Sequence, residues 1–203
     1  MLFIKHRVNK RSDLVTVKQE WGVEIDLRSH VDAPGKIFLS HDPWVEGDDL
    51  ETWVEGFNEL QIKGPIILNT KEDGLENRAL EIMKRAKISN FFFLDTALPT
   101  LVKWAEGGRG KHLAVRLSLY EPLKSVELFL GKVDWVWVDC FGGKPLPVEM
   151  LRQLHGKIKI CVVSPELHGQ SIDLLSEFYD LYALADAVCT KQPEKWKQIQ
   201  LMH

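Results

Sequence analysis

The stretch GPIILNTKEDGLENRALEIMKRAKISNFFFLDT, residues 64–96, decides the fold class. It begins and ends with short apolar runs, Ile66–Leu68 and Phe91–Leu94, and a segment with helical spacing of its apolar residues lies between them. Short continuous apolar runs are typical of parallel strands that are covered on both faces. The stretch therefore predicts a strand, a crossover helix and a second, parallel strand.

The same alternation continues along the whole chain. We expect eight strands, at Leu2–Arg7, Gly22–His30, Gly64–Lys71, Asn90–Thr96, His112–Ser118, Val133–Cys140, Lys157–Ser164 and Asp186–Lys191. Helical spacing predicts helices at Asp48–Leu60, Glu76–Ala86, Pro99–Glu106, Lys124–Leu130, Pro147–His155 and Ser171–Leu184. Residues Lys36–Asp42 are predicted as an additional extended piece after the second strand.

Eight repeated βα units predict an α/β protein, a compact (β/α)₈ TIM barrel. The chain has 203 residues, against about 250 for a typical barrel, so the loops must be short. No linker or low-complexity segment divides it, and we expect a single domain over residues 1–203. An open doubly wound sheet is the alternative, although no G-x-G-x-x-G follows the first strand to support a dinucleotide site.

Composition excludes several classes of protein. The net charge of −3 gives no general attraction to nucleic acid or anionic lipid. The three cysteines, Cys140, Cys161 and Cys189, lie far apart in strand-like runs, which favours neither a disulfide framework nor a zinc site and fits a reducing compartment. The N-terminus lacks a signal-peptide core, and no apolar run approaches the roughly 20 residues of a membrane span. We therefore expect a cytoplasmic protein.

Polar side chains gather where the predicted strands end, which in a barrel is the edge that carries the chemistry. They are His6, Arg7, Glu24, Asp26, Asn69, Lys71, Asp95, Arg116, Ser118, Asp139 and Ser164. Strand periodicity places Glu24 and Asp26 on one face, where two carboxylates repel each other unless a cation lies between them. Oxygen ligands of this kind suit Mg²⁺ or Ca²⁺. His6 and His41 add imidazoles with a pKa suited to proton transfer.

These residues resemble the motifs of the glycerophosphodiester phosphodiesterase family, which belongs to the phospholipase C-like phosphodiesterases and has a (β/α)₈ barrel. The resemblance rests on His6-Arg7, on Gly22-Val23-Glu24-Ile25-Asp26 and on His41-Asp42. Asn69-Thr70-Lys71 stands where the family has E-x-K, and residues 185–190 followed by Pro193 are similar to its last strand. The resemblance spans the whole chain, with its specific motifs in the first third.

The resemblance implies a role for each matching residue. Glu24, Asp26 and Asn69 would be ligands of a divalent cation, Mg²⁺ or Ca²⁺. His6 and His41 would be the acid–base pair. Arg7 and Lys71 would hold phosphate oxygens, and Arg116 is a further candidate for this role. The reaction implied is metal-dependent hydrolysis of a small phosphodiester with a glycerol-like group.

The sequence departs from the family in three places, and these keep alternatives open. No E-N-T segment follows His6-Arg7, Asn69 replaces the usual third carboxylate, and the helical insertion between the second and third strands is missing. A catalytically impaired barrel that binds a phosphorylated ligand is one alternative, and a cyclising lyase of the same superfamily is another.

Each site residue also has a structural interpretation. Glu24 and Asp26 would form a salt-bridge platform for Arg7, Lys71 or Arg116, and Arg116 would pair with Asp95 or Asp139. Asp95 would alternatively supply the missing carboxylate to the cation. We assign Trp135 and Trp137 to the core, Trp44 to the mouth, and the remaining histidines, His168 among them, to the surface or to loops.

Overall fold

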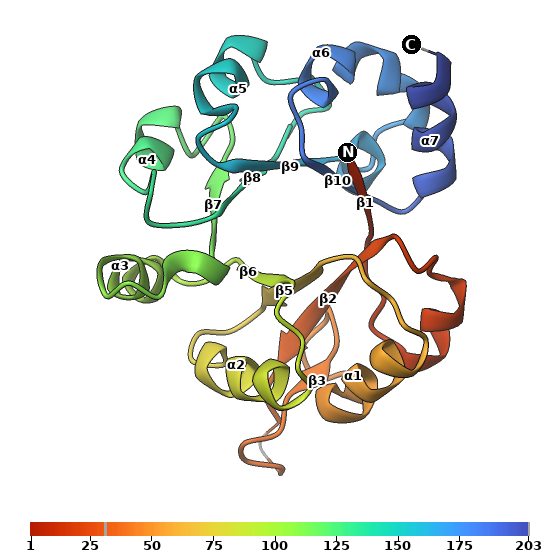
Figure 1. The fold of residues 1–203 in the computed structure, drawn as a ribbon, viewed down its shortest axis with the longest axis vertical. Helices are drawn as coiled ribbons and strands as arrows, with labels where there is room; N and C mark the ends of the chain where they lie inside the picture. The colour runs from red at the N-terminus through yellow and green to blue at the C-terminus, as the bar shows by residue number, and fades with distance from the viewer. Residues whose placement is uncertain (31, 203) are drawn as a thin grey trace.

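Strands and helices alternate along the chain in the computed structural model, which describes the backbone of residues 1–30 and 32–202 and the side chains as far as residue 198 (Figure 1). The strands are β1 (Leu2–Lys5), β2 (Gly22–Arg28), β3 (Phe38–Leu39), β4 (Asp48–Asp49), β5 (Ile66–Thr70), β6 (Phe91–Leu94), β7 (Ala114–Leu117), β8 (Trp135–Val138), β9 (Lys159–Val163) and β10 (Ala187–Thr190). The α-helices are α1 (Leu50–Glu59), α2 (Glu76–Arg85), α3 (Leu98–Glu106), α4 (Leu123–Glu127), α5 (Val148–Leu154), α6 (Tyr179–Tyr182) and α7 (Pro193–Met202).

Eight of the strands are parallel and pair in the order β6-β5-β2-β1-β10-β9-β8-β7. These are the eight strands that the sequence predicts, each within the predicted range. The chain's first and last parallel strands, β1 and β10, are direct neighbours, with Ile4 opposite Cys189. In Figure 1 the helices lie outside the strands, with α1 and α2 on one side and α5, α6 and α7 on the other.

Hydrogen bonding between the two end strands, β6 and β7, is limited in the described residues to one isolated parallel bridge from Phe93 to Leu113. The mixed α/β fold in a single unit is therefore present as expected. The described residues do not form a continuous hydrogen-bonded ring of eight strands, so full closure of the barrel stays a prediction.

The apolar side chains form two separate clusters, one on each side of the strands. The smaller cluster lies inside, with residues from β1 and β5 to β10, and Phe92 stacks on Trp135 at its centre with ring centroids 4.6 Å apart. The larger cluster fills the layer between strands and helices. On β2, Val23, Ile25 and Leu27 belong to the outer layer, so the alternate residues Glu24 and Asp26 face the interior. Trp135 and Trp137 are buried, as predicted.

Several strands end earlier than the sequence predicts, because residues at their ends leave the extended conformation. Arg7 and Asp95 both adopt a positive φ, of 54° and 61°. A non-glycine residue with this backbone conformation ends the regular ladder and is found often at functional sites. The turns take Arg7 and Asp95 out of the sheet, directly after His6, whose N–H still donates to the Thr190 carbonyl of β10 at 3.0 Å.

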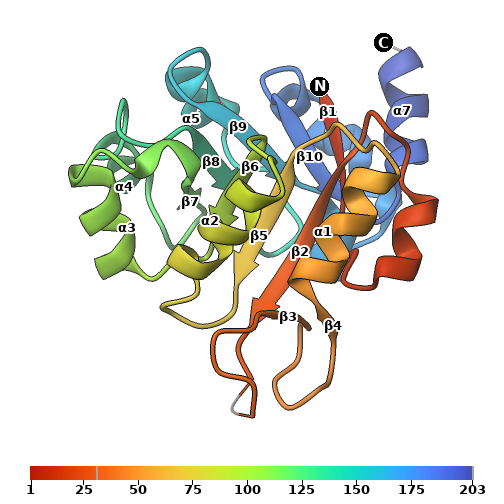
Figure 2. The same ribbon diagram turned by 60° about the horizontal axis from the view of Figure 1, so that its bottom comes forward.

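Two other elements differ from the prediction. Residues 171–184 do not form one helix: a 3₁₀ segment, Ile172–Phe178, leads into the single turn of α6. The 3₁₀ segment Arg11–Thr16 occupies the first crossover, where no helix is predicted. The extended piece predicted at Lys36–Asp42 contains β3, which pairs antiparallel with the end of β2 and with β4. Figure 2 shows this extension projecting beyond the carboxyl ends of β2 and β5.

Two further expectations concern the cysteines and the membrane. Cys140, Cys161 and Cys189 are all buried and free, as predicted, and burial raises the pKa of the Cys140 thiol to about 11. Across the part of the chain that the structure describes, every helix is too short or too polar to cross a bilayer.

Candidate active site

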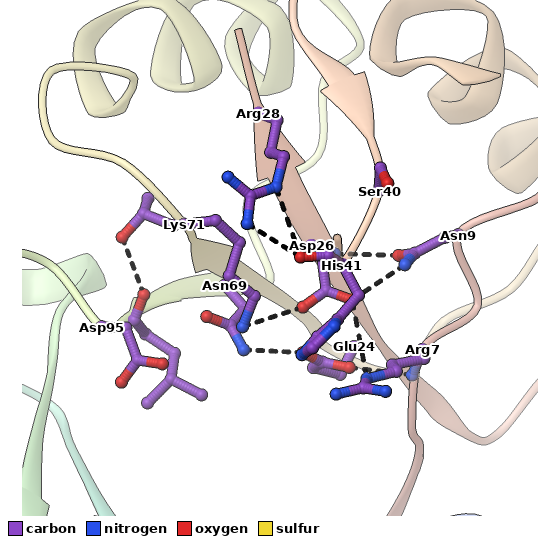
Figure 3. A network of polar contacts seen from close by, with 12 residues as sticks. Arg7, Asn9, Glu24, Asp26, Arg28, Ser40, His41, Asn69, Lys71 and Asp95 are labelled. Carbon is purple, nitrogen blue, oxygen red and sulfur yellow. Dashed lines mark hydrogen bonds and ion pairs between the residues drawn. The ribbon is translucent and has the colours of Figure 1, made fainter. Parts of the chain in front are cut away.

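The carboxyl ends of β1, β2 and β5 bring together most of the side chains that the sequence singles out (Figure 3). Glu24 and Asp26 extend from β2, and Asn69 opposes Asp26 on β5. His6 and Arg7 follow β1, and Lys71 follows β5. We call Glu24 and Asp26 the acidic pair; both are almost fully buried.

Glu24 is held by donors from two neighbouring strands. The backbone N–H of Arg7 donates to Oε2 at 2.8 Å, and Asn69 Nδ2 donates to Oε1 at 2.9 Å. His6 Nε2 lies 3.7 Å from the same Oε2. The positive φ of Arg7 thus has a local reason, since it turns the amide onto the carboxylate. These contacts fix the carboxylate before any ligand arrives.

Asp26 is held by a different set of donors. Asn9 Nδ2 donates to Oδ2 at 2.8 Å, and the Asp26 N–H donates back to Asn9 Oδ1 at 2.8 Å. The ammonium of Lys71 lies 3.0 Å from Oδ1, and Arg7 Nε lies 3.9 Å from Oδ2. Asp26 therefore forms the ion pairs with Lys71 and Arg7 that the salt-bridge interpretation expects, whereas Glu24 forms neither. Sequence analysis missed Asn9, which no motif marks.

Burial dominates the ionisation of this site. It raises the pKa of Glu24 from 4.5 to about 7, with the neighbouring charge of Asp26 as the second cause. Burial, together with the positive charge of Arg7, lowers the pKa of His6 from 6.5 to about 3. His6 is therefore neutral at pH 7, and its Nδ1 is buried without a hydrogen-bond partner among the described residues.

His41 reaches the same edge from the β3 extension. The N–H of Ser40 donates to the Asp26 carbonyl at 3.1 Å, and Arg28 Nη2 donates to the His41 carbonyl at 2.8 Å. His41 Nδ1 lies 2.7 Å from Asp42 Oδ1, and this hydrogen bond lowers the pKa of Asp42. The imidazole is 40% exposed, and it lines the same shallow hollow as Asn9. Beyond it, the Trp44 side chain is 96% exposed.

A second group of charges lies across the mouth, on the ends of β6, β7 and β8. Arg116 forms ion pairs with Asp95 and Asp139, and its Nε lies 3.6 Å from Glu121 Oε1. The pairing alternative for Arg116 is therefore confirmed, and its role towards phosphate stays a prediction. The ion pair with Arg116 also occupies the carboxylate of Asp95, which sequence analysis considered as a replacement ligand for the cation.

His168 lies in a loop, as sequence analysis expects, but the contact that it makes there was not foreseen. It is half-buried after β9, and its Nε2 lies 3.1 Å from Asp139 Oδ1. Its ring meets Phe141 edge to face, with centroids 4.9 Å apart. Nothing in its sequence spacing indicates this, because the contact joins the loops that follow β8 and β9.

The acidic pair and Asn69 carry the oxygen atoms that a divalent cation would require. The Asn69 Oδ1 atom is buried and without a hydrogen-bond partner among the described residues, beside two buried carboxylates. Unsatisfied buried oxygens of this kind suit a hard cation. Lys71 already supplies one positive charge to Asp26, so a cation would share the site with it or displace it. No cluster of three His, Cys, Asp or Glu side chains arranged for a metal occurs in the described part of the chain.

Comparison with known proteins finds the same fold in solved structures. No family model matches the sequence, and no curated protein does. A structure named as a candidate glycerophosphodiester phosphodiesterase, from Galdieria sulphuraria, superposes with a TM-score of 0.72 at 16% identity, over 95% of this chain and 94% of that one. A glycerophosphodiester phosphodiesterase from Agrobacterium tumefaciens superposes with a TM-score of 0.65 at 9% identity, over 96% of this chain and 98% of that one. The chain therefore has the fold of these structures along nearly its whole length.

Proposed function

We propose that this chain is a compact (β/α)₈ barrel that hydrolyses a small, glycerophosphodiester-like substrate at the carboxyl ends of its strands. The observation that carries the proposal is the buried acidic pair, flanked by His6, Arg7 and Lys71 at that edge. The fold that the chain shares with the two phosphodiesterase structures supports it. The proposal makes the chain a phosphoric diester hydrolase.

A divalent cation, Mg²⁺ or Ca²⁺, is part of the proposal. Glu24, Asp26 and the free Oδ1 of Asn69 would hold it, because they supply three oxygen atoms on one side of the mouth. When bound, the cation neutralises charge on the phosphate that is under attack.

Arg7 and Lys71 are proposed to bind the phosphate oxygens. Arg7 has room to exchange partners, since its Nε is 3.9 Å from Asp26 and its side chain is 41% exposed. Positive charge held beside the phosphate stabilises the negative charge that develops in the transition state. We expect Lys71 to leave Asp26 Oδ1 for the phosphate when substrate binds.

The two histidines are proposed to divide the proton transfers. Burial lowers the pKa of His6 and leaves it neutral. The negative charge of a bound phosphodiester would raise this pKa again, so that the imidazole can accept a proton from the attacking water or hydroxyl. His41 Nδ1 lies 2.7 Å from Asp42 Oδ1, and this contact orients the imidazole with its other ring nitrogen free to face the substrate. His41 would therefore protonate the leaving oxygen. A substrate hydroxyl that attacks in place of water would give a cyclic phosphate, the product of the lyase alternative.

One observation favours a second candidate function, an impaired barrel that binds a phosphorylated ligand. Lys71 already neutralises Asp26, and Asn69 contributes no charge, so the site is less negative than one with three carboxylates. Such a site would bind a phosphate ester and turn it over slowly or not at all.

Turnover of bis-p-nitrophenyl phosphate and of glycerophosphodiesters, with and without EDTA, tests the proposal. We expect activity that requires Mg²⁺ or Ca²⁺ and that is lost in His6→Ala and in His41→Ala. His155→Ala is the matched control, because His155 is an exposed histidine that follows α5. Inactivity with every metal and substrate, together with intact binding of phosphate esters, would favour the impaired barrel, and a cyclic product in ³¹P NMR would favour the lyase.

A further inference from the structure

Lys191 follows β10 at the mouth, and the proposed function gives it no role. β10 pairs with β1, with Ile4 opposite Cys189, and the His6 N–H donates to the Thr190 carbonyl at 3.0 Å. Ile4 and Cys189 both belong to the inner cluster, so strand alternation sets His6 and Lys191, each two residues further along, at the mouth above them. Figure 1 shows β1 and β10 side by side. Lys191 is therefore a neighbour of His6 across two strands.

The charge of Lys191 reaches the proposed site. It is one of the causes that lower the pKa of His6, and it acts on His6 more strongly than the charge of Lys71 does. Lys71 itself lies in the site, with its ammonium 3.0 Å from Asp26 Oδ1. Because the interaction between two charges falls with distance, the ammonium of Lys191 belongs to the same charged surface as the acidic pair and its cations.

Lys191 differs from the other cations of the mouth because its ammonium has no partner. Arg7 and Lys71 both pair with Asp26, and Arg116 is shared among three carboxylates. Within the part of the chain that the structure describes, Lys191 forms a hydrogen bond through its backbone N–H, and its exposed ammonium forms neither a hydrogen bond nor an ion pair. It can meet an anion without first leaving a carboxylate, which Arg7 and Lys71 cannot do.

The backbone beneath this free side chain is fixed. The N–H of Lys191 donates to Glu166 Oε1 at 2.9 Å, and the hydroxyl of the buried Thr190 donates to the same oxygen. The Ser164 hydroxyl donates to the other oxygen of Glu166, so the loop after β9 is tied to the end of β10. A fixed backbone reduces the entropy that is lost when the ammonium binds a ligand.

We propose that Lys191 binds a phosphate oxygen of the substrate on the His6 side of the mouth, and that it does so while the ion pairs of Asp26 are still in place. The inference rests on the proposed function and adds a binding residue to it. A free ammonium attracts the anionic phosphodiester and holds it beside His6, where Arg7 and Lys71 then exchange Asp26 for the phosphate. A contact made equally in the ground state and the transition state lowers KM and leaves kcat unchanged.

Binding of inorganic phosphate to the metal-free protein tests the inference without any turnover. In EDTA, Lys191→Gln should weaken phosphate binding about fivefold in an NMR titration, whereas Lys191→Arg should keep it. Lys157→Gln is the matched control, because Lys157 is an exposed lysine that precedes β9, at the opposite edge of the sheet. High salt should reduce the difference between Lys191→Gln and the wild type, since it screens an exposed ion pair. Equal binding by these two proteins, or no binding of phosphate by the wild type, would overturn the inference.

Kinetics with bis-p-nitrophenyl phosphate separate this inference from the proposed function. Lys191→Gln should raise KM about fivefold with kcat nearly unchanged, a pattern that partial loss of folded protein does not produce. An unchanged KM with turnover intact would reject the role of Lys191 alone. Phosphate binding that depends on Lys191, in a protein that hydrolyses no phosphodiester, would reject the proposed hydrolysis and leave Lys191 as a binding residue.

Discussion

Replacing Glu24 by glutamine should change how the stability of the metal-free protein depends on pH. The folded protein holds the pKa of Glu24 at about 7, and its ordinary value is 4.5. Between these values the folded state carries a proton on Glu24 that the unfolded state has lost. The stability that this proton contributes is complete below pH 4.5 and is lost as the pH rises through about 7.

The magnitude follows from linkage. One proton of difference changes the free energy of unfolding by about 1.4 kcal/mol per pH unit, so the whole window is worth about 3 kcal/mol. Glu24→Gln removes this dependence, and its stability should rise relative to the wild type between pH 4.5 and about 7. The substitution also disturbs the hydrogen bonds from Arg7 and Asn69. The resulting change in the free energy of unfolding is the same at every pH, so it does not alter the shape of the profile.

Urea unfolding in EDTA, at pH steps between about 4 and 8, measures this difference. His6→Ala provides the opposite case, because the pKa of His6 is lowered from 6.5 to about 3. The stability linked to neutral His6 is present above pH 6.5 and is lost as the pH falls through about 3, so His6→Ala should lose stability relative to the wild type as the pH rises through this window. Parallel profiles for Glu24→Gln and the wild type would refute the reasoning, because they would show that Glu24 ionises as it does in the unfolded chain.

Three further substitutions test other parts of the structure. Lys71→Met removes the closer of the two ion pairs of the buried Asp26 carboxylate and leaves only the longer one to Arg7. It should cost about 3 kcal/mol in urea unfolding, with part of the loss recovered by Ca²⁺, and a cost below about 0.5 kcal/mol would mean that Lys71 does not neutralise Asp26. Asn69→Asp places a third carboxylate beside the acidic pair and should increase the rise in Tm that Ca²⁺ causes, whereas an unchanged rise would remove Asn69 from the cation site. Phe92→Ala empties the centre of the inner cluster, where Phe92 stacks on Trp135, and should cost about 3–5 kcal/mol in the same unfolding assay; a smaller loss would show that the interior is loosely packed.

The sequence predicts the parallel strands well because each is buried on both faces. A strand that is apolar at every position, such as Phe91–Leu94, must be covered on both faces. Here the inner apolar cluster covers one face and the layer of helices covers the other. The helix expected at Ser171–Leu184 is wrong in form, since local spacing alone does not separate an α-helix from a 3₁₀ segment. The limited pairing of β6 with β7 depends on how the whole sheet curves, and no local pattern encodes it.

The site was predictable where it follows strand periodicity. Glu24 and Asp26 lie on one face because they are two residues apart on a strand, and Asn69 lies opposite Asp26 in the paired strand, with Lys71 two residues further along. The partners of each carboxylate were not predictable. Asn9 reaches Asp26 across a turn, and the contact of His168 with Asp139 joins two loops that only the assembled sheet brings together.

A crystal structure of the protein soaked with Ca²⁺ and a non-hydrolysable phosphonate diester tests the central claim most directly. The account predicts a cation within about 2.3–2.6 Å of oxygen atoms of Glu24 and Asp26. It also predicts that the ammonium of Lys71 has moved from Asp26 to the phosphonate, and that His6 and His41 lie on opposite sides of the phosphorus. A structure in which Lys71 keeps its place on Asp26, and cation and phosphonate lie elsewhere, would contradict it.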